Sequence, residues 1–244
     1  MTRTRQIPLR TVFANTVRNR LSYTVGYGGN DLNSGNKRIL ITPQFATIGN
    51  AEKQIRIGDI KPVSSATVGN RRITIYTLTD GGKTDQTYIW NGSNWTHNSK
   101  DASNEYFPAG KGLWVYCQMT AGTVVNLQGS GEVSKEDIVV RLVGGNKRTA
   151  CGNGFPMAVK FKNIIPEAVT QGQLIGNRRI TIYTLTDGGK TDQTYIWNGS
   201  NWTHNSVDAS EEDLPAGKGL WVYCQVPVAT TLVDLRIKSP VKDL

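Results

Sequence analysis

Residues 73–90 read ITIYTLTDGGKTDQTYIW, and this stretch decides the fold class of the chain. In its first six residues, β-branched and aromatic side chains alternate with period two, which is typical of a strand. The DGG sequence at 80–82 is a strong hairpin-turn signal, and residues 87–90 return as the partner strand. Residues 113–117, LWVYC, predict a further strand that is apolar on both faces, which suits either the middle of a sandwich or a sheet covered by a neighbour. Since we find no long helical period, we expect an all-β protein.

The same stretch occurs twice in the chain. Residues 69–118 and 176–225 are identical at 46 of 50 positions, with a spacing of 107 residues. This period is the size of a small domain and exceeds the roughly 20–50 residues of solenoid units. We therefore expect two tandem homologous β-sandwich or barrel-like domains, residues 21–133 and 134–244, preceded by an extended N-terminal arm of residues 1–20.

Each copy contains a Tyr-x-Trp-Asn stretch, a separate tryptophan and a Pro-Ala-Gly-x-Gly-Leu-Trp-Val stretch. These are Tyr88–Asn91, Trp95 and Pro108–Val115 in the first copy, and Tyr195–Asn198, Trp202 and Pro215–Val222 in the second. The pattern resembles that of uncharacterised bacterial tandem β-repeat proteins. The resemblance covers most of residues 36–235 and implies duplicated β-domains, without implying an activity.

More than half of the net charge of +9 lies near the N-terminus, because residues 1–30 contain five arginines and no acidic residue. Basic arms bind nucleic acid, anionic surfaces or acidic partner subunits, and a solvated tail is the alternative. An isolated arm of 20 residues cannot bury its own apolar side chains. We expect it to dock on a neighbouring subunit by adding a strand to a sheet edge, with docking on its own chain as the alternative. The expected docking residues are Arg3, Arg5, Ile7, Leu9, Arg10, Val12, Phe13 and Val17.

We expect no catalytic residues, no cofactor and no metal site. The two histidines, His97 and His204, share an Asn-Trp-Thr-His-Asn setting that lacks a nucleophile elbow or a triad context. Asp80 and Asp85 flank a hairpin tip, which favours turn capping over paired catalytic carboxylates. The groups that lie near the histidines in sequence are Ser99, Asp101, Asp85, Ser206, Asp208 and Asp192.

The cysteines predict no disulfide framework. Cys117 and Cys224 occupy equivalent positions in the two copies, and Cys151 has no partner by symmetry. We expect all three to be small buried hydrophobic residues.

All six tryptophans lie in the two copies. Aromatic rings interleaved with Asn and Thr can stack on sugars, although filling a core or an intersubunit contact is the favoured interpretation. The sugar-stacking candidates are Trp90, Trp95, Trp197 and Trp202. The Asn-x-Ser/Thr sequences at Asn91, Asn94, Asn198 and Asn201 matter only in a glycosylating compartment.

These patterns predict a non-enzymatic structural protein that self-assembles into a homopolymer, as a filament, sheet or shell. One alternative is a carbohydrate-binding module with two sites. Another is a virion or shell protein whose basic arm contacts nucleic acid. The expected partners are other copies of the chain, with nucleic acid, an anionic surface or a glycan as further candidates.

The sequence contains no run of about 18–20 apolar residues, so we expect no membrane span. Its first twenty residues lack the apolar segment of a standard signal peptide, although many proteins with the resembling pattern carry one. We expect an extracellular filament or a virion component rather than a soluble cytoplasmic enzyme.

Overall fold

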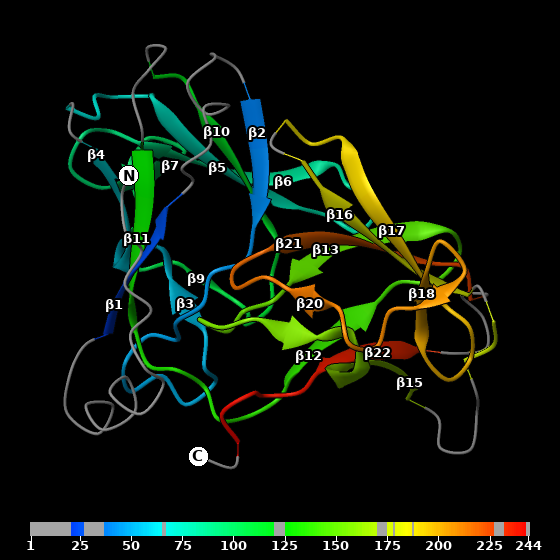
Figure 1. Ribbon diagram of the computed structural model, residues 1–244. Coiled ribbons are helices and arrows are strands. Elements are labelled where there is room, and N and C mark those ends of the chain that lie inside the picture. The colour runs from blue at the N-terminus through cyan, green and yellow to red at the C-terminus, as the bar shows by residue number, and fades with distance from the viewer. Residues whose placement is uncertain are drawn as a thin grey trace, which may run out of the picture.

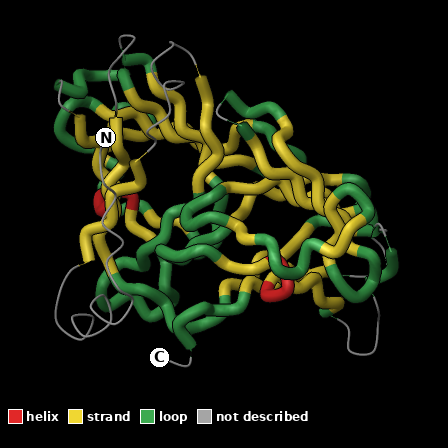
Figure 2. Tube along the Cα trace, viewed as in Figure 1, coloured by secondary structure: helices red, strands yellow, loops and turns green. Residues whose placement is uncertain are grey.

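The computed structural model describes residues 21–26, 37–64, 67–119, 125–169, 175–177, 179–186, 188–226 and 232–242. Strands dominate this part of the chain, and the helical elements within it are two short 3-10 turns (Figure 2). The predicted all-β class is therefore confirmed. In the described ranges, no helix has the length and apolar character that crossing a membrane requires.

Within the described residues, the first half of the chain forms three antiparallel sheets (Figure 1). Its elements are β1 (Leu21–Gly26), β2 (Lys37–Ile41), β3 (Ile55–Arg56), η1 (Ile57–Asp59), β4 (Ile60–Ser64), β5 (Ile73–Leu78), β6 (Thr84–Trp90), β7 (Trp95–His97), β8 (Lys100–Asp101), β9 (Tyr106–Phe107), β10 (Leu113–Cys117) and β11 (Val125–Gly131). The six-stranded sheet has the order β2-β10-β5-β6-β7-β8. The three-stranded sheet has the order β1-β11-β4, and β3 pairs with β9.

The second half also forms three sheets. Its elements are β12 (Ile138–Leu142), β13 (Lys147–Gly152), β14 (Val159–Lys160), η2 (Phe161–Asn163), β15 (Ile164–Ala168), β16 (Ile180–Leu185), β17 (Thr191–Trp197), β18 (Trp202–His204), β19 (Val207–Asp208), β20 (Asp213–Leu214), β21 (Gly219–Cys224) and β22 (Val233–Ile237). The sheet orders are β13-β21-β16-β17-β18-β19, β12-β22-β15 and β14-β20.

The two halves have the same strand order in all three sheets, and their registers correspond. Trp114 of β10 lies opposite Leu40 of β2, as Trp221 of β21 lies opposite Ala150 of β13. β11 ends at Gly131 and β12 begins at Ile138. The domain limits 21–133 and 134–244 stay a prediction from the sequence.

The hairpin between β5 and β6 forms within residues 73–90. Ile75 pairs with Tyr88, and a register shift follows toward the turn. Gly81 and Gly82 have φ values of 104° and 85°, in a region that residues with a Cβ rarely adopt. The glycine pair therefore allows the tight reversal that the sequence predicted.

Each half has its own hydrophobic core between its six-stranded and three-stranded sheets. Buried side chains from both sheets share one cluster in each half, because alternate residues of each strand point inward. Representative members are Ile75, Val115 and Leu127 in the first core, and Ile182, Val222 and Leu235 in the second.

The two halves contact each other through reciprocal backbone hydrogen bonds. The Gly81 N–H donates to the Arg148 carbonyl at 2.8 Å. At the equivalent positions, the Gly188 N–H donates to the Arg38 carbonyl at 3.1 Å. The hairpin tip of each six-stranded sheet therefore bonds to the edge strand of the other sheet.

A second reciprocal pair extends the contact along both edge strands. The Thr42 N–H donates to the Gly217 carbonyl at 2.9 Å, and the Gly152 N–H donates to the Gly110 carbonyl at 3.2 Å. Both edges are thus partly paired across the two halves. Because each half offers the same groups and receives the same groups, the contact has the form of an isologous interface.

Apolar side chains from both halves pack beside these hydrogen bonds. Trp114 and Trp221 approach each other with ring centroids 6.5 Å apart. Each ring lies against a glycine of the opposite half, so that a Cβ added at Gly189 would lie 2.6 Å from Trp114. The cluster consists of Leu40, Leu78, Ala150, Leu185 and Trp221, with Trp114 and Tyr183 packed against it.

Candidate functional site

The proposed arm lies outside the residues that the structure describes, so its role stays a prediction. The docking candidates concerned are Arg3, Arg5, Ile7, Leu9, Arg10, Val12, Phe13 and Val17. The site residues that can be placed are the tryptophans, the histidines and the residues around them.

The four tryptophans named for sugar stacking lie in the two cores. Trp95 and Trp202 have no exposed surface, and Trp90 and Trp197 are 7% and 8% exposed. The two rings of each half pack edge to face with centroids 5.3 Å apart. A sugar ring needs an open aromatic face, and these indoles offer none in this structure.

The indole N–H groups are also used inside the protein. Trp95 donates to the carbonyl of Ile60, and Trp202 donates to the carbonyl of Ile164, each at 2.6 Å. These bonds tie the six-stranded sheet of each half to its three-stranded sheet. They give Trp95 and Trp202 a structural role.

Other aromatic side chains lie on the outer face of the six-stranded sheets. On β10, Leu113, Val115 and Cys117 are buried, whereas Trp114 and Tyr116 are only partly buried. The Arg38 guanidinium lies 5.9 Å from the ring centroids of both Tyr76 and Tyr116. The period-two alternation of a strand assigns these rings to the outer face of the sheet.

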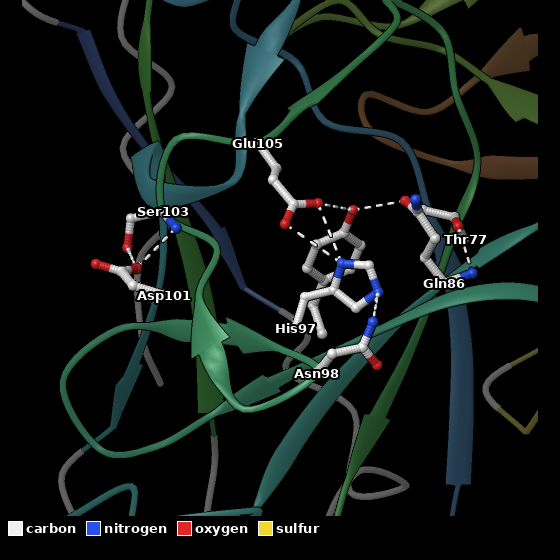
Figure 3. A network of polar contacts seen from close by, with 8 residues as sticks. Thr77, Gln86, His97, Asn98, Asp101, Ser103 and Glu105 are labelled. Carbon is white, nitrogen blue, oxygen red and sulfur yellow. Dashed lines mark hydrogen bonds and ion pairs between the residues drawn. The ribbon is translucent and has the colours of Figure 1, made fainter.

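His97 belongs to a polar network with Glu105 (Figure 3). Its Nδ1 lies 3.3 Å from both carboxylate oxygens of Glu105, and its Nε2 lies 3.1 Å from the side-chain nitrogen of Asn98. The Tyr88 hydroxyl lies 2.7 Å from Oε2 of Glu105 and 2.6 Å from Oε1 of Gln86. Burial, together with the Glu105 carboxylate, raises the pKa of Tyr88.

The second half repeats this network at equivalent residues. Nδ1 of His204 lies 3.3 Å from Oε1 of Glu212, and its Nε2 lies 3.2 Å from Asn205. The Tyr195 hydroxyl lies 2.8 Å from Glu212 and 2.7 Å from Gln193. Two copies of one arrangement therefore contain the same carboxylate, imidazole and phenol.

The residues that contact the histidines differ from the Ser and Asp residues that lie near them in sequence. Asp101 accepts hydrogen bonds from Ser103, and Asp85 accepts one from Thr77, so neither orients His97. The Asn98 amide donates to Nε2 of His97 when Nδ1 carries the proton, so both ring nitrogens have neighbours within the protein. These contacts connect the imidazole on β7 to Glu105, which directly precedes β9.

The described residues contain no group of three or more His, Cys, Asp and Glu side chains placed to hold a metal ion. The three cysteines are free thiols, and all three are buried, as the sequence predicted. Burial raises the pKa of Cys151 to about 12 and also raises those of Cys117 and Cys224.

We predict that none of the three thiols reacts rapidly with a thiol reagent in the native protein at pH 8. Three equivalents should react after unfolding in guanidinium chloride, which absorbance of the released thiolate measures. The pKa values are raised in the folded state. The buried thiols therefore make their full contribution to the free energy of unfolding below the unfolded-state pKa of about 8.5. This contribution should fall as the pH rises toward 12. Rapid reaction of a native thiol at pH 8 would contradict the buried positions.

No family model matches the chain, and no curated protein matches it either. The resemblance to tandem β-repeat proteins therefore stays a prediction that rests on the motif residues.

Proposed function

We propose that the chain is a non-enzymatic structural subunit that associates with other copies of itself. The reciprocal contact between its halves carries this proposal. One β-unit binds a second unit of the same strand order through sheet-edge hydrogen bonds and a tryptophan that fits over a glycine. Units that recognise one another through sheet edges can also associate between chains. The polar networks around His97 and His204 are contacts within each half.

The contact between the halves is closed, because an isologous interface uses up both of its surfaces. Association between chains therefore needs other surfaces. In the described part of the chain, the outer strands of the three-stranded sheets have one neighbour each, which leaves the second edges of β1, β4, β12 and β15. Pro62 in β4 and Pro166 in β15 remove a backbone donor and blunt those two strands.

β1 and β12 contain no proline, and we propose that the open edge of one of these two strands accepts the arm of a neighbouring chain. Val139, the second residue of β12, is 45% exposed, so this strand presents apolar surface beside its edge. Residues 1–20 combine apolar and basic side chains and have no acidic residue. A strand added at this edge would bury the apolar side chains and satisfy backbone groups of both chains.

We expect that deleting residues 1–20 prevents polymer formation while both halves stay folded. Light scattering after size-exclusion chromatography and electron microscopy measure assembly. Circular dichroism and thermal unfolding test the fold of the truncated chain. A second variant, Val139→Lys, keeps the arm and should also weaken assembly, because a charged edge resists strand addition. Polymers of normal length from the truncated chain, or a wild-type chain that stays monomeric, would contradict the proposal.

The three-arginine variant with Arg3, Arg5 and Arg10 replaced by serine separates the two kinds of partner. If acidic groups of a neighbouring chain bind the arm, the variant should assemble less well. If nucleic acid is the partner, nucleic acid should copurify with the wild-type chain. The affinity of the chain for nucleic acid should then fall steeply as the salt concentration rises.

A further inference from the structure

The side chains at the centre of the contact between the halves break the symmetry of its backbone hydrogen bonds. Thr42 and Gly152 occupy equivalent positions, since they follow the edge-strand residues that pair with Leu113 and Leu220. They also face each other, because a Cβ added at Gly152 would lie 2.5 Å from Oγ1 of Thr42. A residue that meets its own equivalent lies at the axis of a two-fold contact. Threonine therefore occupies one side of this axis and glycine the other.

The same difference in size continues along the two edge strands. Leu40 of β2 is equivalent to Ala150 of β13, because each lies opposite the tryptophan of the neighbouring strand. Leu40 packs on Gly219 of the second half, where an added Cβ would lie 2.6 Å from Cγ of Leu40. Ala150 packs on Gly112 of the first half, where an added Cβ would lie 3.0 Å from Cβ of Ala150. A leucine thus fills one side of the contact, and an alanine fills the equivalent place on the other.

The first half contributes a third large side chain just beyond β2. Gln44 is 5% exposed, and its Nε2 would lie 2.5 Å from a Cβ added at Gly217 of the second half. Its equivalent in the second half is Gly154, at the spacing that relates Thr42 to Gly152. Among the described residues, the buried side-chain amide of Gln44 and hydroxyl of Thr42 have no hydrogen-bond partner. These two side chains therefore act in the contact through their shape.

Two like halves would fit each other less well in this arrangement. If two first halves met, a second Thr42 would replace Gly152, and its Cβ would collide with the hydroxyl of the first. Two leucines would also enter the cluster that now contains Leu40 and Ala150, and overpacking destabilises a dense core. If two second halves met, glycine would face glycine and alanine would replace Leu40, which would leave unfilled space.

We propose that this surface selects an unlike partner, so that the first half of the chain binds the second half and rejects another first half. Leu40 and Thr42 determine the specificity, and Ala150 and Gly152 are their complements. The reciprocal hydrogen bonds use backbone atoms and can form in like and unlike pairs, so the side chains make the choice. This inference goes beyond self-association and does not depend on the arm.

A cycle of four sequences in the full chain tests the preference. Ala150→Leu gives the contact two leucines, Leu40→Ala gives it two alanines, and the double variant exchanges the two residues. We expect each single variant to raise the equilibrium constant of unfolding at least tenfold in denaturant titrations. The double variant should be more stable than either single variant, because it restores an unlike pair. Losses that add in the double variant, or an Ala150→Leu chain as stable as the wild type, would overturn the proposal.

A matched pair of variants at the axis separates shape from polarity. Thr42→Val keeps the shape and removes a hydroxyl that has no partner among the described residues, so it should be at least as stable as the wild type. Thr42→Ala removes the side-chain atoms beyond Cβ and should raise the equilibrium constant of unfolding at least fivefold. Equal stability of Thr42→Ala and Thr42→Val would show that shape at this position does not matter.

Hydrogen exchange in the folded chain shows where the loss of stability lies. The N–H groups of Gly81 and Gly188 bond across the contact, whereas Ile75 and Ile182 belong to the two cores. In Leu40→Ala and Ala150→Leu, the contact amides should exchange at least tenfold faster than in the wild type, with a smaller change for the core amides. Equal acceleration of both groups would overturn the proposal. Because these measurements concern one chain, a wild type that stays monomeric would contradict only the proposed function.

Discussion

Alanine in place of Trp202 is expected to lower the free energy of unfolding by about 3–5 kcal/mol. Trp202 has no exposed surface, and its ring packs on Trp197 at 5.3 Å and on Phe161 at 6.2 Å between centroids. The substitution leaves a cavity in a core that cannot fully collapse. It also removes the donor that bonds the Ile164 carbonyl at 2.6 Å. Denaturant unfolding followed by circular dichroism measures the change.

The first half provides a matched variant for this experiment. Trp95 is equally buried and donates to the Ile60 carbonyl at the same distance, so Trp95→Ala should cost a similar amount. Trp202→Phe keeps a ring and should cost less. Val207→Ala changes a side chain that is 68% exposed and should alter stability by less than about 0.5 kcal/mol. A Trp202→Ala variant as stable as Val207→Ala would contradict the core assignment.

The sequence predicted the strands well because strand formation depends on local alternation and turn chemistry. In LWVYC, Leu113, Val115 and Cys117 are buried while Trp114 and Tyr116 point to the other face. Apolar residues on both faces predicted either the middle of a sandwich or a sheet covered by a neighbour, and Trp114 packs at the contact between the halves. The local pattern was sufficient to predict which side chains are buried there, because successive residues of a strand point to opposite faces of the sheet.

The candidate polar sites were less predictable because they depend on where loops return. Sequence proximity points to Ser99, Asp101 and Asp85 as neighbours of His97, whereas the structure places Glu105 beside it. Glu105 lies just before β9, and the loop that carries it reverses after β8. The 50-residue repeat does contain a signal, since Glu105 and Glu212 are among the few acids that the two copies share.

The contact between the halves could not be derived from the repeat alone. Identical sequences establish that both halves offer the same groups, but they do not reveal which groups meet. The edge strands β2 and β13 differ in sequence, with Leu40 opposite Trp114 and Ala150 opposite Trp221. Backbone atoms make the reciprocal hydrogen bonds, and backbone atoms leave little trace in side-chain identity.

The reciprocal contact leads to the second prediction with a large expected effect. Trp221→Ala should lower the free energy of unfolding by about 3 kcal/mol, since the ring is 9% exposed and fills the space over Gly82. Trp114→Ala should cost somewhat less, because this ring is only partly buried. Denaturant unfolding of each variant gives the two values.

A double-mutant cycle then tests whether the two rings form one unit. Their centroids are 6.5 Å apart, and both belong to the cluster between the halves, so the combined loss should differ from the sum by about 0.5–3 kcal/mol. Gly189→Val should also destabilise the chain, because φ at this residue is +81° and a Cβ would lie 2.6 Å from Trp114. Gly49→Val is the control, since φ is +75° there and a Cβ meets open space, so it reports the backbone cost alone. If Gly189→Val costs no more than Gly49→Val and the two tryptophan losses add, the halves do not depend on this contact for their stability. The proposal that β-units of this chain recognise one another would then lose the observation that carries it.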